Sequence, residues 1–151
     1  ETETVILAIN SIKRKGNKLY LPILFDLLNS QPEKEIEDEI KQLLATIKNK
    51  ETIGSFMDAV QNNKYKPILK TLLTVCWHNG LDFSDYTPIF IDLIINSDWK
   101  IAFEAFTIID NFEFVPEQKV VEISITKIEE GLKIADEQKA YFLEEVLKKI
   151  S

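Results

Sequence analysis

Histidine and cysteine, the side chains used most often in metal sites and nucleophilic triads, occur once each in this sequence of 151 residues. His78 and Cys76 are two positions apart, so on a helix they point in different directions and cannot share one metal ion. We expect His78 to be a basic residue that the dipole favours at the end of a helix, and Cys76 to be a small buried side chain. Only four glycines are present, and none of them forms a phosphate-binding loop. We therefore predict no catalytic residue, no metal site and no cofactor.

Long apolar runs and basic clusters are missing as well. No stretch reaches the roughly 20 apolar residues that a helix needs to cross a bilayer. The formal net charge is −7 and the isoelectric point is near 4.8, whereas proteins that bind nucleic acids or anionic lipids present a clustered basic face. We predict no nucleic-acid partner and no membrane partner. We expect a cytoplasmic protein, with a secreted protein whose signal peptide has been removed as the alternative.

The sequence does contain a repeated apolar phrase with an aspartate at its centre. Asp26, Asp58 and Asp92 stand 32 and 34 residues apart in the phrases LFDLLN, FMDAVQ and FIDLII. Periods between about 20 and 50 residues are typical of solenoids, in which similar units bury their apolar faces against their neighbours. With 45% hydrophobic residues, the chain can form one continuous domain over 1–151. The three carboxylates could bind cations, but their register with packing residues favours a structural role, such as bonding to a turn of the neighbouring unit.

Helical periodicity accounts for nearly the whole chain, and strand signals are sparse. We expect Ser30 and Glu33 to form a capping box, Ser97 to be an N-cap, and Gly80 to end a helix in the left-handed conformation. The sequence predicts about nine helices. One of them is short and begins near residue 20, and the others cover about 4–15, 33–48, 52–62, 68–79, 85–96, 98–112, 117–133 and 136–150.

Two stretches of the sequence resemble the HEAT and armadillo-like α-solenoids. Both have an early proline, Pro22 or Pro88, a short polar turn and a longer second helix, in LPILFDLLNSQPEKEIEDEIKQLLATI and TPIFIDLIINSDWKIAFEAFTII. The resemblance implies a right-handed α-α superhelix of helix pairs. The sequence departs from the family where an arginine often begins the second helix, because Glu37 and Ala102 stand there.

The same resemblance implies that the second helix of each pair lines a concave face. Aromatic side chains stand off the core stripe on three of these expected helices, and such rings make good interface anchors. We predict that Trp77, Phe103 and Tyr141, together with Lys70, bind a protein or peptide partner. For Phe103, packing between neighbouring repeats is the alternative.

We expect a non-catalytic scaffold or adaptor that binds an extended peptide or a partner helix. Two other classes stay open: a helical-repeat enzyme, such as a lyase or a glycosylase, and a purely structural module of a larger protein. The acidic charge balance argues against a glycosylase, because a resemblance to the helical-repeat glycosylases would imply a positively charged cleft.

Overall fold

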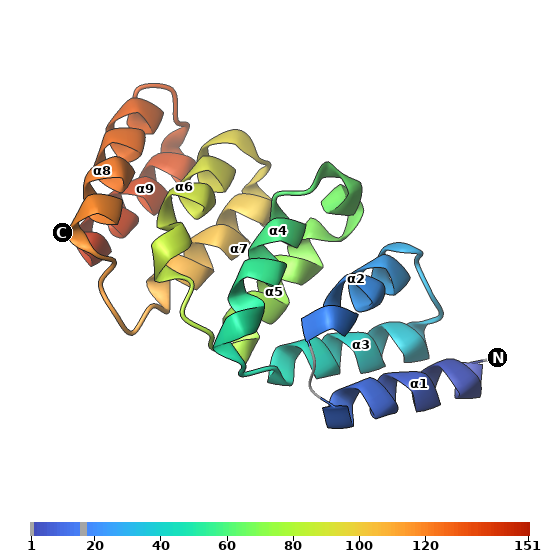
Figure 1. Cartoon of the computed structure of the whole chain (residues 1–151). Helices are drawn as coiled ribbons and strands as arrows, with labels where there is room; N and C mark the ends of the chain where they lie inside the picture. Colours follow the sequence, from blue (N-terminus) through green and yellow to red (C-terminus); the bar gives the residue numbers. More distant parts are fainter. Residues whose placement is uncertain (1, 16–17) are drawn as a thin grey trace. The chain divides into compact units, whose positions relative to one another are not determined.

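The computed structural model describes residues 2–15 and 18–151, and all regular secondary structure in this part of the chain is helical. Within the same residues there are nine α-helices, as the sequence predicts, and four short 3-10 helices, which it did not predict (Figure 1). The chain divides into two compact units, Glu1–Leu81 and Asp82–Ser151, which we call unit 1 and unit 2.

Unit 1 contains two helix pairs that follow a first, single helix. The helices α2 and α3 form the first pair, and α4 and α5 form the second. The first helices of the two pairs, α2 and α4, contact each other, as do the second helices, α3 and α5, while α1 packs on α3. The elements are α1 (Thr2–Lys15), η1 (Lys18–Tyr20), α2 (Leu21–Asn29), α3 (Lys34–Thr46), η2 (Lys50–Thr52), α4 (Ile53–Val60), η3 (Asn63–Ile68) and α5 (Leu69–Asn79).

Unit 2 repeats this arrangement with two further pairs. Here α6 pairs with α7 and α8 pairs with α9; the first helices α6 and α8 contact each other, and so do the second helices α7 and α9. The elements are η4 (Ser84–Tyr86), α6 (Thr87–Asn96), α7 (Trp99–Asp110), α8 (Gln118–Leu132) and α9 (Glu137–Ile150).

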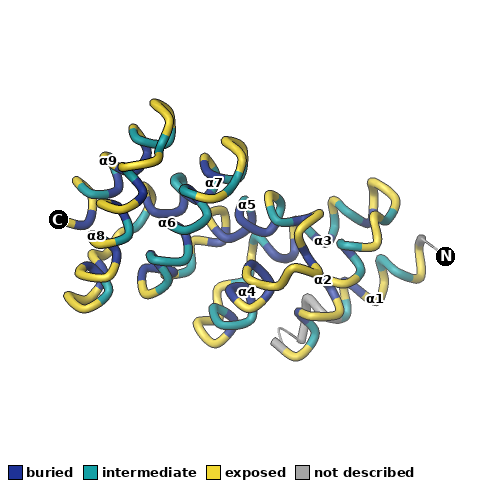
Figure 2. The backbone as a smooth tube through the Cα atoms, turned by 90° about the horizontal axis from the view of Figure 1, so that it is seen from above, coloured by how far each residue is buried: buried dark blue, intermediate teal, exposed yellow. Residues whose placement is uncertain are grey.

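Each of the helices α2 to α9 buries a set of side chains on one face. On α3 the buried side chains are Ile36, Ile40, Leu43 and Leu44, which recur with the helical period, while the remaining positions are mostly charged. Figure 2 shows how buried and exposed residues alternate along the helices. On α7 the small residues Ala102 and Ala105 are fully buried.

One predicted helix end is confirmed and two predicted caps are wrong. Gly80 ends α5 in the left-handed conformation, with φ of 70°. Ser30 does not cap α3, because it ends α2 and its hydroxyl donates to the Leu27 carbonyl. Ser97 likewise ends α6, and the N-cap of α7 is Asp98, whose carboxylate accepts the backbone N–H of Ile101 at 3.0 Å. The N-cap position of α3 is held by Glu33, whose side chain makes no capping hydrogen bond.

Lysines distant in sequence bind the free carbonyl groups at helix ends. In unit 2, the Lys139 ammonium on α9 donates to the carbonyls of Ile95 and Ser97 at the end of α6, and Lys149 donates to that of Asp110 at the end of α7. In unit 1, Lys48 donates to the Asn79 carbonyl at the end of α5. A positive charge at a helix C-terminus also complements the helix dipole.

Gly131 lies where α8 approaches α6 and α9 closely. A Cβ atom at this position would stand 2.5 Å from Cδ1 and 2.8 Å from Cγ1 of Ile95, and 3.2 Å from Cδ1 of Leu143. The side chains of α6 and α9 therefore occupy the space that a larger residue would need.

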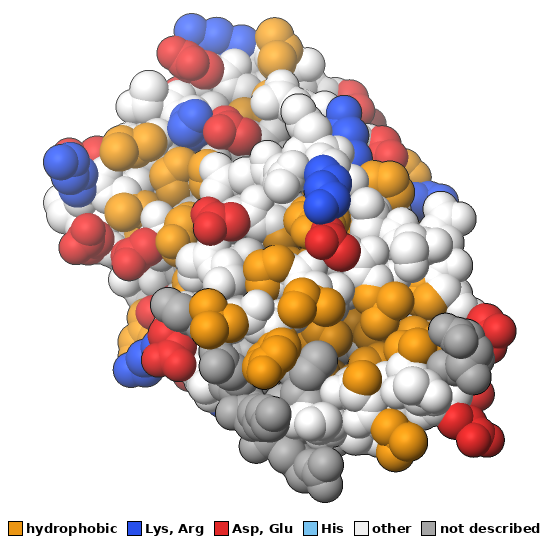
Figure 3. Space-filling view, turned by 45° about the vertical axis from the view of Figure 1, so that its right-hand side comes forward, with side chains coloured by type: hydrophobic (Ala, Val, Ile, Leu, Met, Phe, Trp, Pro, Cys, Tyr) orange, Lys and Arg blue, Asp and Glu red, His pale blue; other side chains and the backbone are white. Residues whose placement is uncertain are grey.

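The surface carries charges of both signs. Figure 3 shows acidic and basic side chains interspersed on one face, with hydrophobic side chains gathered in the lower half of the view. Several large hydrophobic side chains are exposed in both units, and in unit 1 they include Leu7, Leu19 and Ile23.

Candidate binding sites

Two of the three recurrent aspartates bind groups of the next helix pair, as a structural role requires. On α2, the Asp26 carboxylate lies 2.7 Å from the Lys64 ammonium and accepts the Tyr65 hydroxyl at 2.6 Å, both from η3. On α6, the two oxygens of Asp92 accept from the Lys127 ammonium at 3.0 and 3.2 Å. These contacts join consecutive pairs within unit 1 and within unit 2.

The hydrogen bond between Tyr65 and Asp26 changes the acidity of both groups. The Lys64 ammonium, and then the Tyr65 hydroxyl, hold the pKa of Asp26 below its ordinary value because both donate to the charged carboxylate. Burial, and then the hydrogen bond to Asp26, raise the pKa of Tyr65 to about 12. The Tyr65 ring packs edge-on against Phe25, with ring centroids 5.9 Å apart.

The third recurrent aspartate, Asp58 on α4, departs from the predicted structural role. Its side chain is exposed, and it has no hydrogen bond or ion pair with any residue in the described part of the chain. The predicted bond to a neighbouring turn is therefore wrong for Asp58. Its surroundings are also different, because it lines a pocket.

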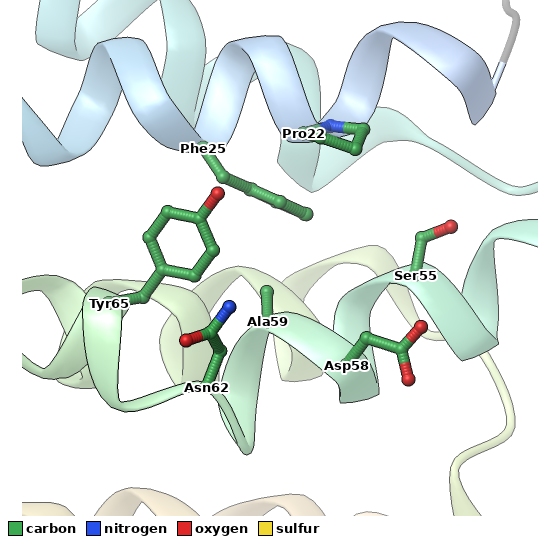
Figure 4. A pocket seen from close by; sticks show the side chains of 7 residues that line it. All are labelled: Pro22, Phe25, Ser55, Asp58, Ala59, Asn62 and Tyr65. Atoms are coloured by element: carbon green, nitrogen blue, oxygen red, sulfur yellow. The ribbon is translucent and has the colours of Figure 1, made fainter.

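This pocket, which we call the Asp58 pocket, lies between α2 and the segment formed by α4 and η3 in unit 1 (Figure 4). Its volume is about 180 Å³. Pro22 and Phe25 of α2 face Ala59 across it, the Tyr65 ring closes one end, and polar groups stand on its α4 side. The lining residues are Pro22, Phe25, Ser55, Asp58, Ala59, Asn62 and Tyr65.

Two of the predicted partner-binding residues lie close together in unit 2. Phe103 on α7 is 45% exposed and Tyr141 on α9 is 58% exposed. Both rings lie beside the buried ring of Phe142, with centroid distances of 6.1 and 6.2 Å. Phe103 thus packs against the neighbouring helix pair, which was its alternative role, and still offers a large part of its surface to solvent.

Two further aromatic residues extend this cluster and were not predicted from the sequence. Trp99, Phe103 and Phe106 stand at positions i, i+4 and i+7 of α7, which places them on one face of the helix. Trp99 is 54% exposed, and the half-buried Phe106 stacks on Phe142 with ring centroids 4.9 Å apart. The helical spacing of three aromatic residues is the signal that could have found them. We call Trp99, Phe103, Phe106 and Tyr141 the aromatic surface.

The other two predicted partner-binding residues, Lys70 and Trp77, lie on α5 in unit 1. They are seven positions apart and therefore share a face of the helix, and both side chains are exposed. The Trp77 ring contacts that of His78, with centroids 4.2 Å apart. His78 lies in the last turn of α5, as expected, and Cys76 is buried, which raises the pKa of its thiol.

No group of three or more His, Cys, Asp or Glu side chains in residues 2–15 and 18–151 is placed to hold a metal ion. Over the same ranges, none of the helices combines the length and the apolar character needed to cross a lipid bilayer. Comparisons of the chain with protein-family models, with curated proteins and with solved structures give no match.

Proposed function

We propose that this protein is a non-catalytic binding module, a scaffold or adaptor, whose aromatic surface takes a peptide or a helix of a partner protein. The observation that carries the proposal is the group of rings around Phe142, formed by Phe103, Phe106 and Tyr141, with the exposed Trp99 on the same face of α7 as Phe103. Large rings of this kind anchor protein interfaces because they bury much area with few rotatable bonds.

The packing of these rings favours binding over simple exposure of apolar area. Phe103 and Phe106 contact Phe142, which is itself buried, so two of the four rings are held in place before a partner arrives. A preorganised surface loses less conformational entropy on binding than a mobile one. Exposed apolar patches on soluble proteins commonly mark such interaction sites.

The proposal includes the finer architecture that the sequence suggests. The helix pairs are taken as HEAT-like repeats that continue into one right-handed superhelix, in which second helices such as α5, α7 and α9 line the concave face. The repeated contacts of first helix with first helix and of second helix with second helix, within each unit, support this arrangement. Lys70 and Trp77 on α5 would then belong to the same binding face.

The test uses a double variant, Trp99→Ala with Tyr141→Ala, in the full chain. Partners are captured from the native cell with the wild-type protein, identified, purified and then titrated against the variant. Removing two anchors should weaken direct binding by about 30-fold or more, because a truncation at an interface anchor costs about 1 kcal/mol or more, and two together cost about 2 kcal/mol. The melting temperature should stay close to that of the wild type, since both side chains are more than half exposed.

Phe114→Ala is the matched control. Phe114 is an aromatic residue of the same unit, 64% exposed, and it lies between α7 and α8 outside the aromatic surface. Its removal should leave the affinity unchanged. The proposal fails if the double variant binds every identified partner as tightly as the wild type, or if Phe114→Ala weakens binding equally.

A further inference from the structure

Asp58 stands at the repeat position of Asp26 and Asp92 but lacks the cation that each of them has. Asp26 is paired with Lys64, 38 residues further on, and Asp92 with Lys127, 35 residues further on. The corresponding stretch after Asp58 contains no lysine, and the sequence has neither lysine nor arginine anywhere from residue 71 to residue 99. The chain thus keeps the carboxylate of this position and omits its internal counterion.

The Asp58 pocket gives this carboxylate an apolar site beside it. Pro22, Phe25 and Ala59 supply apolar walls, while Ser55 and Asp58 place oxygen atoms at the α4 side. Its volume of about 180 Å³ is below the roughly 300 to 1,000 Å³ of sites for drug-sized ligands and cofactors. The pocket therefore suits one side chain rather than a whole metabolite.

The unpaired Asp58 carboxylate favours a positively charged side chain. The Lys64 ammonium lies in the same region, 5.3 Å from the centroid of the Tyr65 ring. That ammonium is held by Asp26, which leaves Asp58 without an internal partner. The net charge of −7 also favours a basic partner over an acidic one.

Between the two basic side chains, arginine fits a carboxylate beside apolar walls better than lysine. A guanidinium group is planar, is more weakly hydrated than an ammonium, and can bind both oxygens of a carboxylate. We infer that the Asp58 pocket binds the guanidinium group of an arginine side chain presented by a partner protein. This inference concerns unit 1 and does not depend on the aromatic surface of unit 2.

The experiment titrates the full chain with N-acetyl-L-arginine amide and follows backbone amide resonances by NMR. Saturable shifts should appear at Ser55, Asp58 and Asn62, all of which line the pocket. N-acetyl-L-citrulline amide has nearly the same shape without the charge and should leave these resonances in place. Asp58→Asn should weaken the binding of the arginine amide about tenfold, as expected for the loss of one charge-assisted contact.

Glu35→Gln provides the matched control, because it removes the same charge from an exposed position of α3 outside the pocket. It should bind the arginine amide as the wild type does. Asp58 is exposed and without an internal partner, so Asp58→Asn should keep the wild-type melting temperature. Asp58→Glu should restore most of the affinity.

Several results would overturn the inference. The first is the absence of saturable shifts with the arginine amide, and the second is equal binding of the citrulline amide. Equal weakening by Asp58→Asn and Glu35→Gln would show an effect of bulk charge alone. Finally, free L-arginine that binds about tenfold more tightly than the blocked amide would identify a site for a free amino acid and not for a partner's side chain.

Discussion

Tyr65 combines a buried ring with a hydroxyl group that donates to a partly exposed carboxylate. The ring packs on Phe25 in the core of unit 1, and the hydroxyl binds Asp26 on α2, so one side chain joins the two helix pairs through both apolar and polar contacts. Loss of the proton would place a phenolate beside a carboxylate. The contact therefore depends on pH at the alkaline end.

This dependence gives the first prediction, for Tyr65→Phe. The folded pKa of about 12 lies above the ordinary value near 10, so the stabilisation is complete below pH 10 and is lost as the pH rises through 12. The wild type should exceed the variant by about 1 kcal/mol in free energy of unfolding at pH 8, the usual contribution of a hydrogen bond. That difference should shrink between pH 10 and pH 12.

Urea unfolding of both proteins at a series of pH values measures this difference. Tyr65 is the only residue that differs between the two proteins, so the contributions of all other groups cancel in the comparison. A constant difference from pH 8 to pH 12 would contradict the prediction.

At acid pH, the lowered pKa of Asp26 has the opposite consequence. The carboxylate stabilises the folded state above its unfolded pKa, near 3.9, and this stabilisation is lost as the pH falls through the lower folded pKa.

Asp58 shows why the roles of individual side chains were harder to predict than the helices. Its sequence phrase is as apolar as those around Asp26 and Asp92, so local pattern gave all three the same role. The distinction lies 35 to 38 residues further along the chain, where Lys64 and Lys127 have no counterpart for Asp58. The local sequence around a residue therefore does not predict an ion pair with a residue far along the chain.

At the scale of single elements, the start of α7 shows which of two adjacent residues is the N-cap. The Asp98 carboxylate accepts the N–H of Ile101, whereas Ser97 belongs to the end of α6. We predict that Asp98→Ala lowers the free energy of unfolding by about 1 kcal/mol, as removal of an N-cap does, and that Ser97→Ala lowers it by much less. Urea unfolding of both variants measures this, and a larger loss for Ser97→Ala would show that the serine is the cap.

Substitution by alanine should change the stability of the protein in opposite directions at two helical glycines. Gly54 in α4 has no atom within 4 Å of an added Cβ, so Gly54→Ala should stabilise the protein by about 0.5 to 1 kcal/mol through the better helix propensity of alanine. Gly131→Ala should instead destabilise it by about 1 kcal/mol or more, because the methyl group would overlap the Ile95 side chain.

Thermal or urea unfolding of the two glycine variants tests this pair of effects. A cycle with Ile95→Ala isolates the cause, since Gly131→Ala should cost less once the overlapping side chain is shortened. If Gly131→Ala stabilises the protein as much as Gly54→Ala, then α8 has room to move away from α6 and the close packing is not rigid.

The sequence predicted the helices well because their evidence is local. Apolar residues with the helical period fill a whole helix, as in α3 and α7, and the boundaries observed lie within a few residues of those predicted. The caps predicted at Ser30 and Ser97 are wrong, because each serine ends the preceding helix, and the four 3-10 helices were not predicted. Trp99 was missed as a candidate anchor since it stands in the first turn of its helix, directly after the cap.

On the scale of the whole molecule, each unit has its own set of buried side chains and its own repeated helix contacts. We predict that residues 82–151, produced alone, fold into a helical structure with a free energy of unfolding of about 3 to 10 kcal/mol, the range typical for their length. Far-UV circular dichroism and urea unfolding of the fragment measure this. An unfolded fragment would instead support the single cooperative domain over 1–151 that the sequence analysis predicts.

The lysine contacts at helix ends set an order of events for a chain that emerges from the ribosome. The Ile95 carbonyl at the end of α6 accepts from Lys139, which lies 44 positions further along the chain. The Asp110 carbonyl at the end of α7 accepts from Lys149. While α9 is still inside the ribosome, these carbonyls are bound to water and the end of α6 can fray. The carbonyls at the ends of α6 and α7 can therefore gain their lysine partners only after α9 has been translated.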